Sequence, residues 1–305
     1  MKAVRSHDRD AAVKGLVVEE APYPYAGSGD VVVRVRAASF TPEELAWSAS
    51  WVDRSGRDRA PVIPGHEVSG EVAEVAVGTT GLSVGQRVIG LIDWNRDGSL
   101  AEYVAVEARN LVPLPAGIDH VEAAALPMPG LTAWQGLFVH GRLEAGQSVL
   151  VHGAGGGVGM AATQLARDAG ARVIGSGRAG SRDRVLELGA EEFVDLEQPG
   201  WEEAVGRVNL VFDVLGGEVL DRSAALVTPG GTLVSIHEPP PVRPEDGRAL
   251  FFIVEPDRDH LLEVLRRCRE GRFHPLVGAV HPLDHAPEAF RAKKGTVGKT
   301  VIQVA

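Results

Sequence analysis

A glycine-rich turn, Gly-Ala-Gly-Gly-Gly-Val-Gly at residues 153–159, directly follows a short apolar segment at 149–151. Small residues allow the next helix to start close to the strand, and its free N–H groups favour an anion such as a pyrophosphate. The best register is Ala154-x-Gly156-x-x-Gly159, with alanine replacing the first glycine of the dinucleotide fingerprint. The turn therefore predicts cofactor contacts, the alternative being a plain tight turn. The expected contacts are Ala154, Gly155, Gly156, Gly157, Val158 and Gly159.

The second strand of this unit, 171–175, should end where the adenosine ribose is recognised. An NAD site usually carries Asp or Glu there, yet residues 169–182 contain no carboxylate. The segment offers Ser176, Arg178 and Arg182 instead, and arginine binds a phosphate through two parallel hydrogen bonds. These residues predict NADPH as the cofactor. The alternative is that the arginines are merely solvated at a helix start.

The elements around this turn indicate an α/β protein. The first third alternates short β-branched segments with glycine and proline, as in 30–40, 68–78 and 85–93. From residue 148 onward, strand-like and helix-like segments alternate, which is typical of a parallel sheet covered on both sides. The tail after residue 274 returns to short strand-like pieces, so we expect it to rejoin the first domain.

Composition excludes several classes of partner. The 305 residues have a formal net charge of −10 and no long basic run, which argues against nucleic acid. No apolar run reaches the roughly 18 residues of a membrane span, and the N-terminus lacks the apolar region of a signal peptide. The single cysteine, Cys268, rules out an internal disulfide framework and fits a cytoplasmic protein.

Several segments resemble the medium-chain dehydrogenase/reductase superfamily, and the nearest branch looks like the zinc-free quinone oxidoreductases related to zeta-crystallin. The resemblance is carried, in order, by 61–90, 123–137, the glycine turn, 208–217 and 298–304. It implies a GroES-like β domain of residues 1–122 and 272–305. It also implies a Rossmann domain with a doubly wound parallel sheet at residues 123–271, and a homodimer.

Zinc relatives of this superfamily also carry the run Gly65-His66-Glu67. Zinc catalysis needs three protein ligands, commonly including cysteine, and the segment that supplies that cysteine matches residues 36–45, which contain none. The cysteines of a structural zinc lobe are also missing from about 90 to 115. We therefore expect no metal. His66 and Glu67 are interpreted as a turn pair that bonds to backbone near the active cleft.

The resemblance also implies further site residues. Thr132 should lie beside the nicotinamide, and Thr132 and Thr41 are the candidate catalytic residues. Further cofactor contacts are expected from Leu215, Ile236, Phe252, Ile253, Val254 and, across the cleft, Lys299. The expected walls of the substrate pocket are Thr41, Glu44, Trp47, Trp51 and Trp94. Ordinary packing, or a surface charge for Lys299, is the alternative for each of them.

Without a metal, an acceptor that is already electrophilic needs the least activation by the protein. The sequence therefore predicts hydride transfer from NADPH to a quinone or an α,β-unsaturated carbonyl (enone), with a natural-product enoyl reductase as the main variant. One alternative is an NADPH-binding sensor or structural protein with little turnover. A zinc alcohol dehydrogenase is the third hypothesis, and the single cysteine argues against it.

Overall fold

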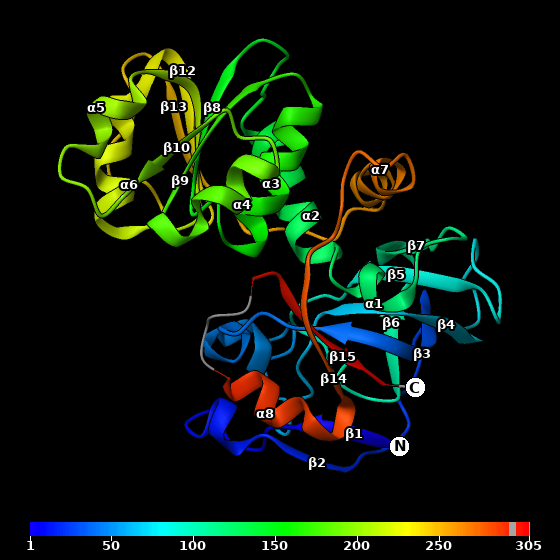
Figure 1. Cartoon of the computed structure of the whole chain (residues 1–305). Coiled ribbons are helices and arrows are strands. Elements are labelled where there is room, and N and C mark those ends of the chain that lie inside the picture. The colour runs from blue at the N-terminus through cyan, green and yellow to red at the C-terminus, as the bar shows by residue number, and fades with distance from the viewer. Residues whose placement is uncertain (293–296, 305) are drawn as a thin grey trace. The chain divides into compact units, whose positions relative to one another are not determined.

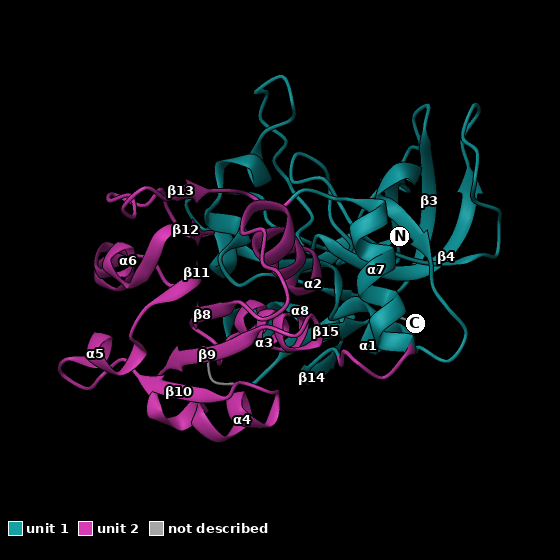
Figure 2. Ribbon diagram, turned by 90° about the horizontal axis from the view of Figure 1, so that it is seen from above, with its two compact units in different colours: residues 1–128, 255–269, 275–305 teal, residues 129–254, 270–274 magenta. Residues whose placement is uncertain are grey.

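The structure, a computed structural model, describes residues 1–292 and 297–304, and it divides into two units (Figure 2). Unit 1 consists of residues 1–128, 255–269 and 275–305, and unit 2 of residues 129–254 and 270–274. The predicted Rossmann domain, 123–271, includes residues 123–128 and 255–269, which fall in unit 1, and it leaves out 272–274, which fall in unit 2. The predicted domain boundaries stay a prediction.

Unit 2 is built on one six-stranded sheet in which every neighbouring pair is parallel (Figure 1). The strand order is β10-β9-β8-β11-β12-β13, which is the doubly wound order with its reversal between β8 and β11. Apolar, β-branched residues fill these strands because both faces are covered. The strands are β8 (Ser148–His152), β9 (Arg172–Gly177), β10 (Glu192–Asp195), β11 (Val208–Asp213), β12 (Val227–Ser235) and β13 (Arg248–Phe251).

Helices cover both faces of this sheet. Figure 1 shows α3 and α4 on one side and α5 and α6 on the other, and the core beneath includes the buried side chains of Leu150, Val211 and Leu233. The helices are α3 (Gly157–Asp168), α4 (Arg182–Glu187), α5 (Trp201–Val205) and α6 (Gly217–Ser223). A further helix, α2 (Pro127–Trp134), begins at the unit boundary and continues as a π-helical segment, Gln135–His140.

Unit 1 holds a largely antiparallel sheet in the order β14-β15-β3-β4-β5-β7, with β6 paired to β3, and a separate two-stranded sheet β1-β2. The C-terminal strand β15 pairs with β3, so the tail lies in the same sheet as the first third of the chain. The strands are β1 (Lys2–Arg5), β2 (Val17–Glu20), β3 (Asp30–Ser39), β4 (Glu67–Val75), β5 (Arg87–Leu91), β6 (Tyr103–Glu107), β7 (Leu111–Pro113), β14 (Val277–Pro282) and β15 (Lys299–Gln303).

Three α-helices of the described residues lie wholly in unit 1. The first, α1 (His120–Ala124), is capped by Asp119, whose carboxylate accepts a hydrogen bond from the Glu122 N–H at 2.8 Å. The others are α7 (Arg258–Arg269) and α8 (Ala286–Arg291). No helix in the described residues has the length and apolar character needed to cross a membrane.

Candidate active site

The glycine turn joins β8 to α3, and its backbone geometry explains which positions must be glycine. A Cβ on Gly159 would lie 2.2 Å from the carbonyl oxygen of Gly153, so α3 can sit this close to the turn only with glycine there. At Gly156, the N-cap of α3, a Cβ would meet nothing nearer than that same oxygen at 3.4 Å. The backbone at Gly156 is exposed and has no side-chain cap, which fits a helix start that accepts a phosphate group.

The turn lies at the point where the strand order reverses. A Cβ on Gly153 would lie 2.5 Å from the side chain of Val214 and 2.9 Å from that of Leu215, so the loop after β11 packs directly against the turn. Ligands of open α/β sheets bind at the carboxyl ends of the strands, where the order reverses. The two segments therefore lie together at the edge of the sheet where a ligand would be expected.

Asp213, at the end of β11, fixes the loop that packs against the turn. Its buried carboxylate accepts hydrogen bonds from the N–H groups of Leu215 (3.2 Å) and Gly216 (3.0 Å) and from the Ser235 hydroxyl (3.0 Å). Burial raises the pKa of Asp213 above its usual range, although these hydrogen bonds act in the opposite direction. Asp213 is not among the predicted site residues, although it directly follows the apolar residues 210–212.

The carboxyl end of β9 differs in one respect from the prediction. Arg178 and Arg182 are both exposed, and the nearby Ser181 packs against the turn, because a Cβ on Gly155 would lie 2.5 Å from the Ser181 Cβ. Ser176, in contrast, is fully buried, and its hydroxyl lies 2.7 Å from His152 Nδ1. Because the Ser176 side chain is buried against His152, we leave Ser176 out of the proposed cofactor contacts.

The remaining predicted cofactor residues of unit 2 occupy varied surroundings. Thr132 is buried within α2. Leu215 and Ile253 are 41% and 66% exposed, whereas Phe252 is buried and its ring lies 4.4 Å from that of His140. Val254 is buried, and the N–H of Ile236 donates to the Asp213 carbonyl at 3.1 Å. Their roles toward a cofactor stay predictions.

Lys299 belongs to a buried hydrogen-bond network within unit 1. Its ammonium group pairs with the Glu67 carboxylate and donates to the Phe40 carbonyl at 2.8 Å. Glu67 also accepts from the Ser39 hydroxyl at 2.6 Å and from the Met128 N–H at 2.9 Å. The ammonium group is thus occupied inside unit 1, and Lys299 is left out of the proposed cofactor contacts. Sequence spacing does not reveal a pair of residues so far apart along the chain.

The expected substrate residues divide into core and surface positions. Trp51 is buried and its indole N–H donates to the Leu45 carbonyl at 2.9 Å, so it is a core residue and not a pocket wall. Trp47 is 37% exposed and packs edge-on against Trp94, with the ring centres 5.2 Å apart. Glu44 is fully buried, and its carboxylate accepts from the backbone N–H groups of Thr41 and Gly65.

His66 stands at the centre of this group. Its ring lies 4.8 Å from that of Trp94, and its Nδ1 lies 3.5 Å from a carboxylate oxygen of Glu44. The side chain is buried, yet neither ring nitrogen has a hydrogen-bond partner in the described part of the chain, and the same holds for the indole nitrogen of Trp94. The sequence predicts that His66 bonds to backbone in a turn, whereas its ring makes no such bond.

These donors do not fit a zinc ion. The described residues contain no group of three or more His, Cys, Asp or Glu side chains placed to hold a metal. Glu67 is engaged by Lys299, Ser39 and the Met128 backbone, and Glu44 by two backbone N–H groups. Cys268, the only cysteine of the sequence, lies on α7, and burial raises the pKa of its thiol to about 12.

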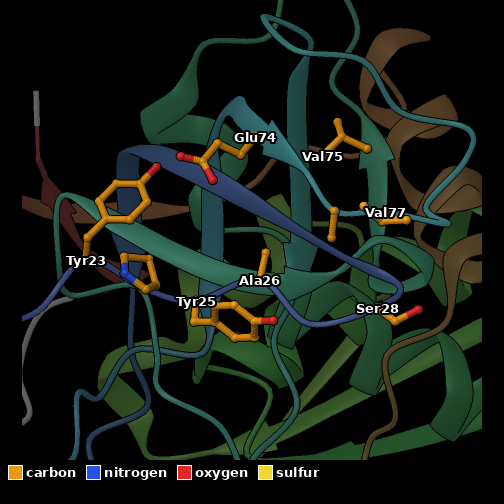
Figure 3. A pocket seen from close by; sticks show the side chains of 9 residues that line it. Tyr23, Tyr25, Ala26, Ser28, Glu74, Val75 and Val77 are labelled. Atoms are coloured by element: carbon orange, nitrogen blue, oxygen red, sulfur yellow. The ribbon is translucent and has the colours of Figure 1, made fainter.

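A separate surface pocket of about 680 Å³ lies in unit 1 (Figure 3). Its lining is mostly aromatic and aliphatic, with Glu74 as its one charged group. Burial, reinforced by a hydrogen bond to Glu74, raises the pKa of Tyr23 to about 12, so its hydroxyl stays protonated. The lining lacks a helix start or an opposing cation for a phosphate, unlike the turn in unit 2. The residues are Tyr23, Pro24, Tyr25, Ala26, Ser28, Glu74, Val75, Ala76 and Val77.

Two family models match the chain. Residues 27–116 match the alcohol dehydrogenase GroES-like domain, and residues 188–302 match the zinc-binding dehydrogenase family. The first match covers β3–β7 of unit 1, and the second begins after α4 and runs through β15.

Curated relatives are similar over most of this chain. The Spectinabilin polyketide synthase system protein NorB of Streptomyces orinoci is 33% identical over 92% of this chain, which spans only 14% of that protein. An acryloyl-coenzyme A reductase of Sulfurisphaera tokodaii is 27% identical over 95% of this chain and 97% of its own length. A quinone oxidoreductase of Rattus norvegicus is 26% identical over 99% of this chain and 97% of its own length.

The fold is also that of a solved oxidoreductase. The crystal structure of an NAD-dependent alcohol dehydrogenase superposes with a TM-score of 0.89 and 28% identity, and each chain covers 100% of the other. The architecture of a GroES-like domain with a Rossmann-like parallel sheet is therefore shown for this chain.

Proposed function

Since the chain belongs to the medium-chain dehydrogenase/reductase superfamily, we propose that it transfers hydride from NADPH to a quinone or an α,β-unsaturated carbonyl compound without a metal. The superfamily implies a nicotinamide cofactor. The observation that carries the proposal is the glycine turn at the strand-order reversal, followed at the end of β9 by two exposed arginines and no carboxylate.

Charge at the end of β9 supports NADPH over NADH. A 2′-phosphate carries roughly two negative charges, which a carboxylate would repel and an arginine binds through paired hydrogen bonds. Among the described residues, the Arg178 side chain has only a long, exposed contact to Glu197, at 3.8 Å, so its guanidinium can turn toward a ligand. Arg182 opens α4 beside the turn and adds a second cation.

The donor set in unit 1 supports a reduction that proceeds without zinc. An alcohol is difficult to oxidise without a Lewis acid, whereas a quinone or enone is polarised enough to accept hydride when it is well aligned. The bound nicotinamide supplies that hydride from its C4 position. The printed names of the acryloyl-coenzyme A reductase and the quinone oxidoreductase are consistent with such acceptors, and similarity to a polyketide synthase protein favours an enoyl reductase of natural-product synthesis.

The chain's own residues have three tasks in this reaction. The turn 153–159 and α3 hold the pyrophosphate, and the Asp213-bound loop 214–217 keeps its place against that turn. Arg178 and Arg182 bind the 2′-phosphate. Removal of water, together with hydrogen-bond donors near the acceptor oxygen, stabilises the negative charge that forms there.

Transfer of deuterium tests the reaction directly. We would incubate the protein with NADPH deuterated at C4 and a cyclic enone or an ortho-quinone, and analyse the products by mass spectrometry and NMR. Deuterium on the β-carbon of a saturated ketone, or stoichiometric hydroquinone, is the expected result. Deuterium on a carbinol carbon, dependent on added zinc, would contradict the proposal. NADPH binding with no turnover on either acceptor would favour a binding protein instead.

A further inference from the structure

Two polar groups of unit 1 are buried without an internal partner: the His66 imidazole, 2% exposed, and the indole N–H of Trp94. Neither His66 nitrogen nor Trp94 Nε1 makes a hydrogen bond to any residue that the structure describes. Buried donors in native proteins are almost always paired with protein, water or a ligand. Two such groups on neighbouring rings, 4.8 Å apart between centres, therefore point to one shared external partner.

The surroundings indicate what kind of partner fits. Trp94 packs edge-on against Trp47, which is 37% exposed, so the two indoles reach from the buried histidine toward the surface. Flat, unsaturated ligands gain most from such aromatic surfaces. The donors beside them suit an oxygen atom carried by that flat ligand.

Glu44 determines which nitrogen of His66 faces the ligand. Its carboxylate oxygen lies 3.5 Å from His66 Nδ1, and two backbone N–H groups keep the carboxylate in place. Within the described chain, His66 is the only basic side chain within 4 Å of the Glu44 carboxylate. When both ring nitrogens carry a proton, Nδ1–H faces the Glu44 carboxylate and Nε2–H is left to donate to a ligand, and the carboxylate compensates the charge of the ring.

We propose that His66 Nε2 and Trp94 Nε1 together bind the oxygen atom of the acceptor, with Glu44 as the residue that positions His66. The proposal rests on the proposed function, in which this oxygen becomes an enolate or phenolate oxygen when the acceptor receives hydride. Two N–H groups aimed at that oxygen bind the negatively charged form more strongly than the neutral carbonyl. The ligand class is thus a planar conjugated carbonyl compound or its enolate.

Binding of a stable enolate mimic tests this site without cofactor or turnover. The probe is 4-nitrophenolate, titrated calorimetrically into the wild-type chain and into His66→Leu, Trp94→Phe and Trp51→Phe. Loss of one hydrogen bond to a charged oxygen should weaken binding roughly tenfold for His66→Leu and for Trp94→Phe. Trp51→Phe is the matched control, since its indole already donates to the Leu45 carbonyl, and it should leave binding unchanged.

Melting temperatures separate a ligand site from a structural role. His66→Leu and Trp94→Phe remove groups without internal partners, so they should melt within a few degrees of wild type, whereas Trp51→Phe should melt lower. Unchanged phenolate affinity in both folded variants would overturn the proposal. If a variant fails to fold, the ¹⁵N NMR spectrum of histidine-labelled wild-type protein replaces it. Bound phenolate should shift the resonance of His66 Nε2, and an unchanged resonance would overturn the proposal.

Failure of the proposed function looks different. Wild-type protein would then bind the phenolate in a His66-dependent way and still transfer no deuterium from NADPH to any acceptor. If the protein transfers deuterium but binds the phenolate equally well without His66 and Trp94, the proposed function stands and this site is refuted.

Discussion

Arg178 and Arg182 are the residues on which cofactor choice depends in this account. Both are exposed beside the glycine turn, and no carboxylate occurs between residues 169 and 182 to repel a phosphate. Their neighbour Ser176, of a type often found in NADPH sites, faces inward to His152 instead. The choice between the two nicotinamide cofactors thus falls to the two guanidinium groups.

Replacing these arginines should weaken NADPH binding selectively. Each hydrogen-bonded phosphate contact contributes about 1.5 kcal/mol or more, so Arg178→Ala and Arg182→Ala should each raise the Kd for NADPH roughly tenfold while the Kd for NADH stays constant. Fluorescence titration with both nucleotides measures this. Arg184→Ala is the control, because Arg184 is exposed on the same helix and lies 3.5 Å from Glu187. Equal losses for NADPH and NADH would refute the assignment.

His152 makes the stability of unit 2 dependent on pH. It is fully buried between the hydroxyls of Ser176 (2.7 Å) and Ser223 (3.0 Å), and burial lowers its pKa to about 3. Below pH 6.5 the histidine of the unfolded chain binds a proton, whereas the buried ring of the folded protein stays neutral. The contribution of the neutral ring to the free energy of unfolding is therefore complete above pH 6.5 and is lost as the pH falls toward 3. The neutral imidazole is therefore a structural group.

Between pH 7 and pH 5 the free energy of unfolding should fall by about 2 kcal/mol because of His152. Urea unfolding at several pH values, in wild type and in His152→Gln, measures it. The wild type should lose more stability over this range than the variant, whose glutamine does not titrate. Parallel pH profiles for the two proteins would show that the buried histidine accepts a proton in the folded state.

At the scale of elements, the junction of β8 and α3 separates two uses of glycine. Gly159 allows the helix to approach the turn, since a Cβ there would lie 2.2 Å from the Gly153 carbonyl oxygen. Gly156 leaves the helix start open to a ligand, since a Cβ there meets no atom closer than 3.4 Å. We therefore predict that Gly159 serves packing and that Gly156 serves binding.

Two alanine substitutions distinguish these uses. Gly156→Ala should keep the melting temperature and weaken nucleotide binding at least roughly tenfold, because its methyl group occupies the face that a phosphate approaches. Gly159→Ala should destabilise the protein by about 1–3 kcal/mol through overpacking, and weaken binding as well. Calorimetric melting and nucleotide titration measure both effects. Normal nucleotide affinity in Gly156→Ala would move the phosphate site elsewhere.

The elements that the sequence predicted well are those determined locally. The turn at 153–159 and the helix after it depend on residues within a few positions of one another. The short strand β10, Glu192–Asp195, was missed because four residues carry little periodicity. Long segments with a strong pattern were therefore predictable, and short edge elements were not.

Side-chain direction was the part of the site that the sequence could not provide. Lys299 pairs with Glu67, which is distant in sequence, and no local pattern encodes that partner. Trp51 and Trp94 look alike in the sequence, yet one indole N–H is satisfied by a carbonyl and the other has no partner in the described residues. Such differences depend on tertiary packing between separate segments.

At the scale of the whole molecule, the six-stranded sheet ends at β13, which pairs with β12 on one side. Phe251 and Ile253, at and just beyond its end, are 36% and 66% exposed. An edge strand with apolar side chains favours pairing with another chain. We therefore predict a homodimer formed by two copies of the segment 249–254.

Sedimentation velocity at micromolar concentration should show a dimer for the wild type. Ile253→Arg places a charge in the predicted interface and should shift the protein to monomer without lowering its melting temperature. Val242→Arg, at a 52% exposed position outside the segment 249–254, is the control and should remain dimeric. A monomeric wild-type protein would contradict the predicted assembly.

The central claim is that this chain is an NADPH-dependent reductase that needs no metal. The most direct measurement is the loss of reduced-nicotinamide absorbance on addition of an ortho-quinone to chelator-treated protein, with NADPH and NADH compared at equal concentration. The account predicts fast oxidation of NADPH, at least roughly tenfold slower oxidation of NADH, and no gain on adding zinc. Activity that appears only with zinc, or equal rates with both nucleotides, would contradict it.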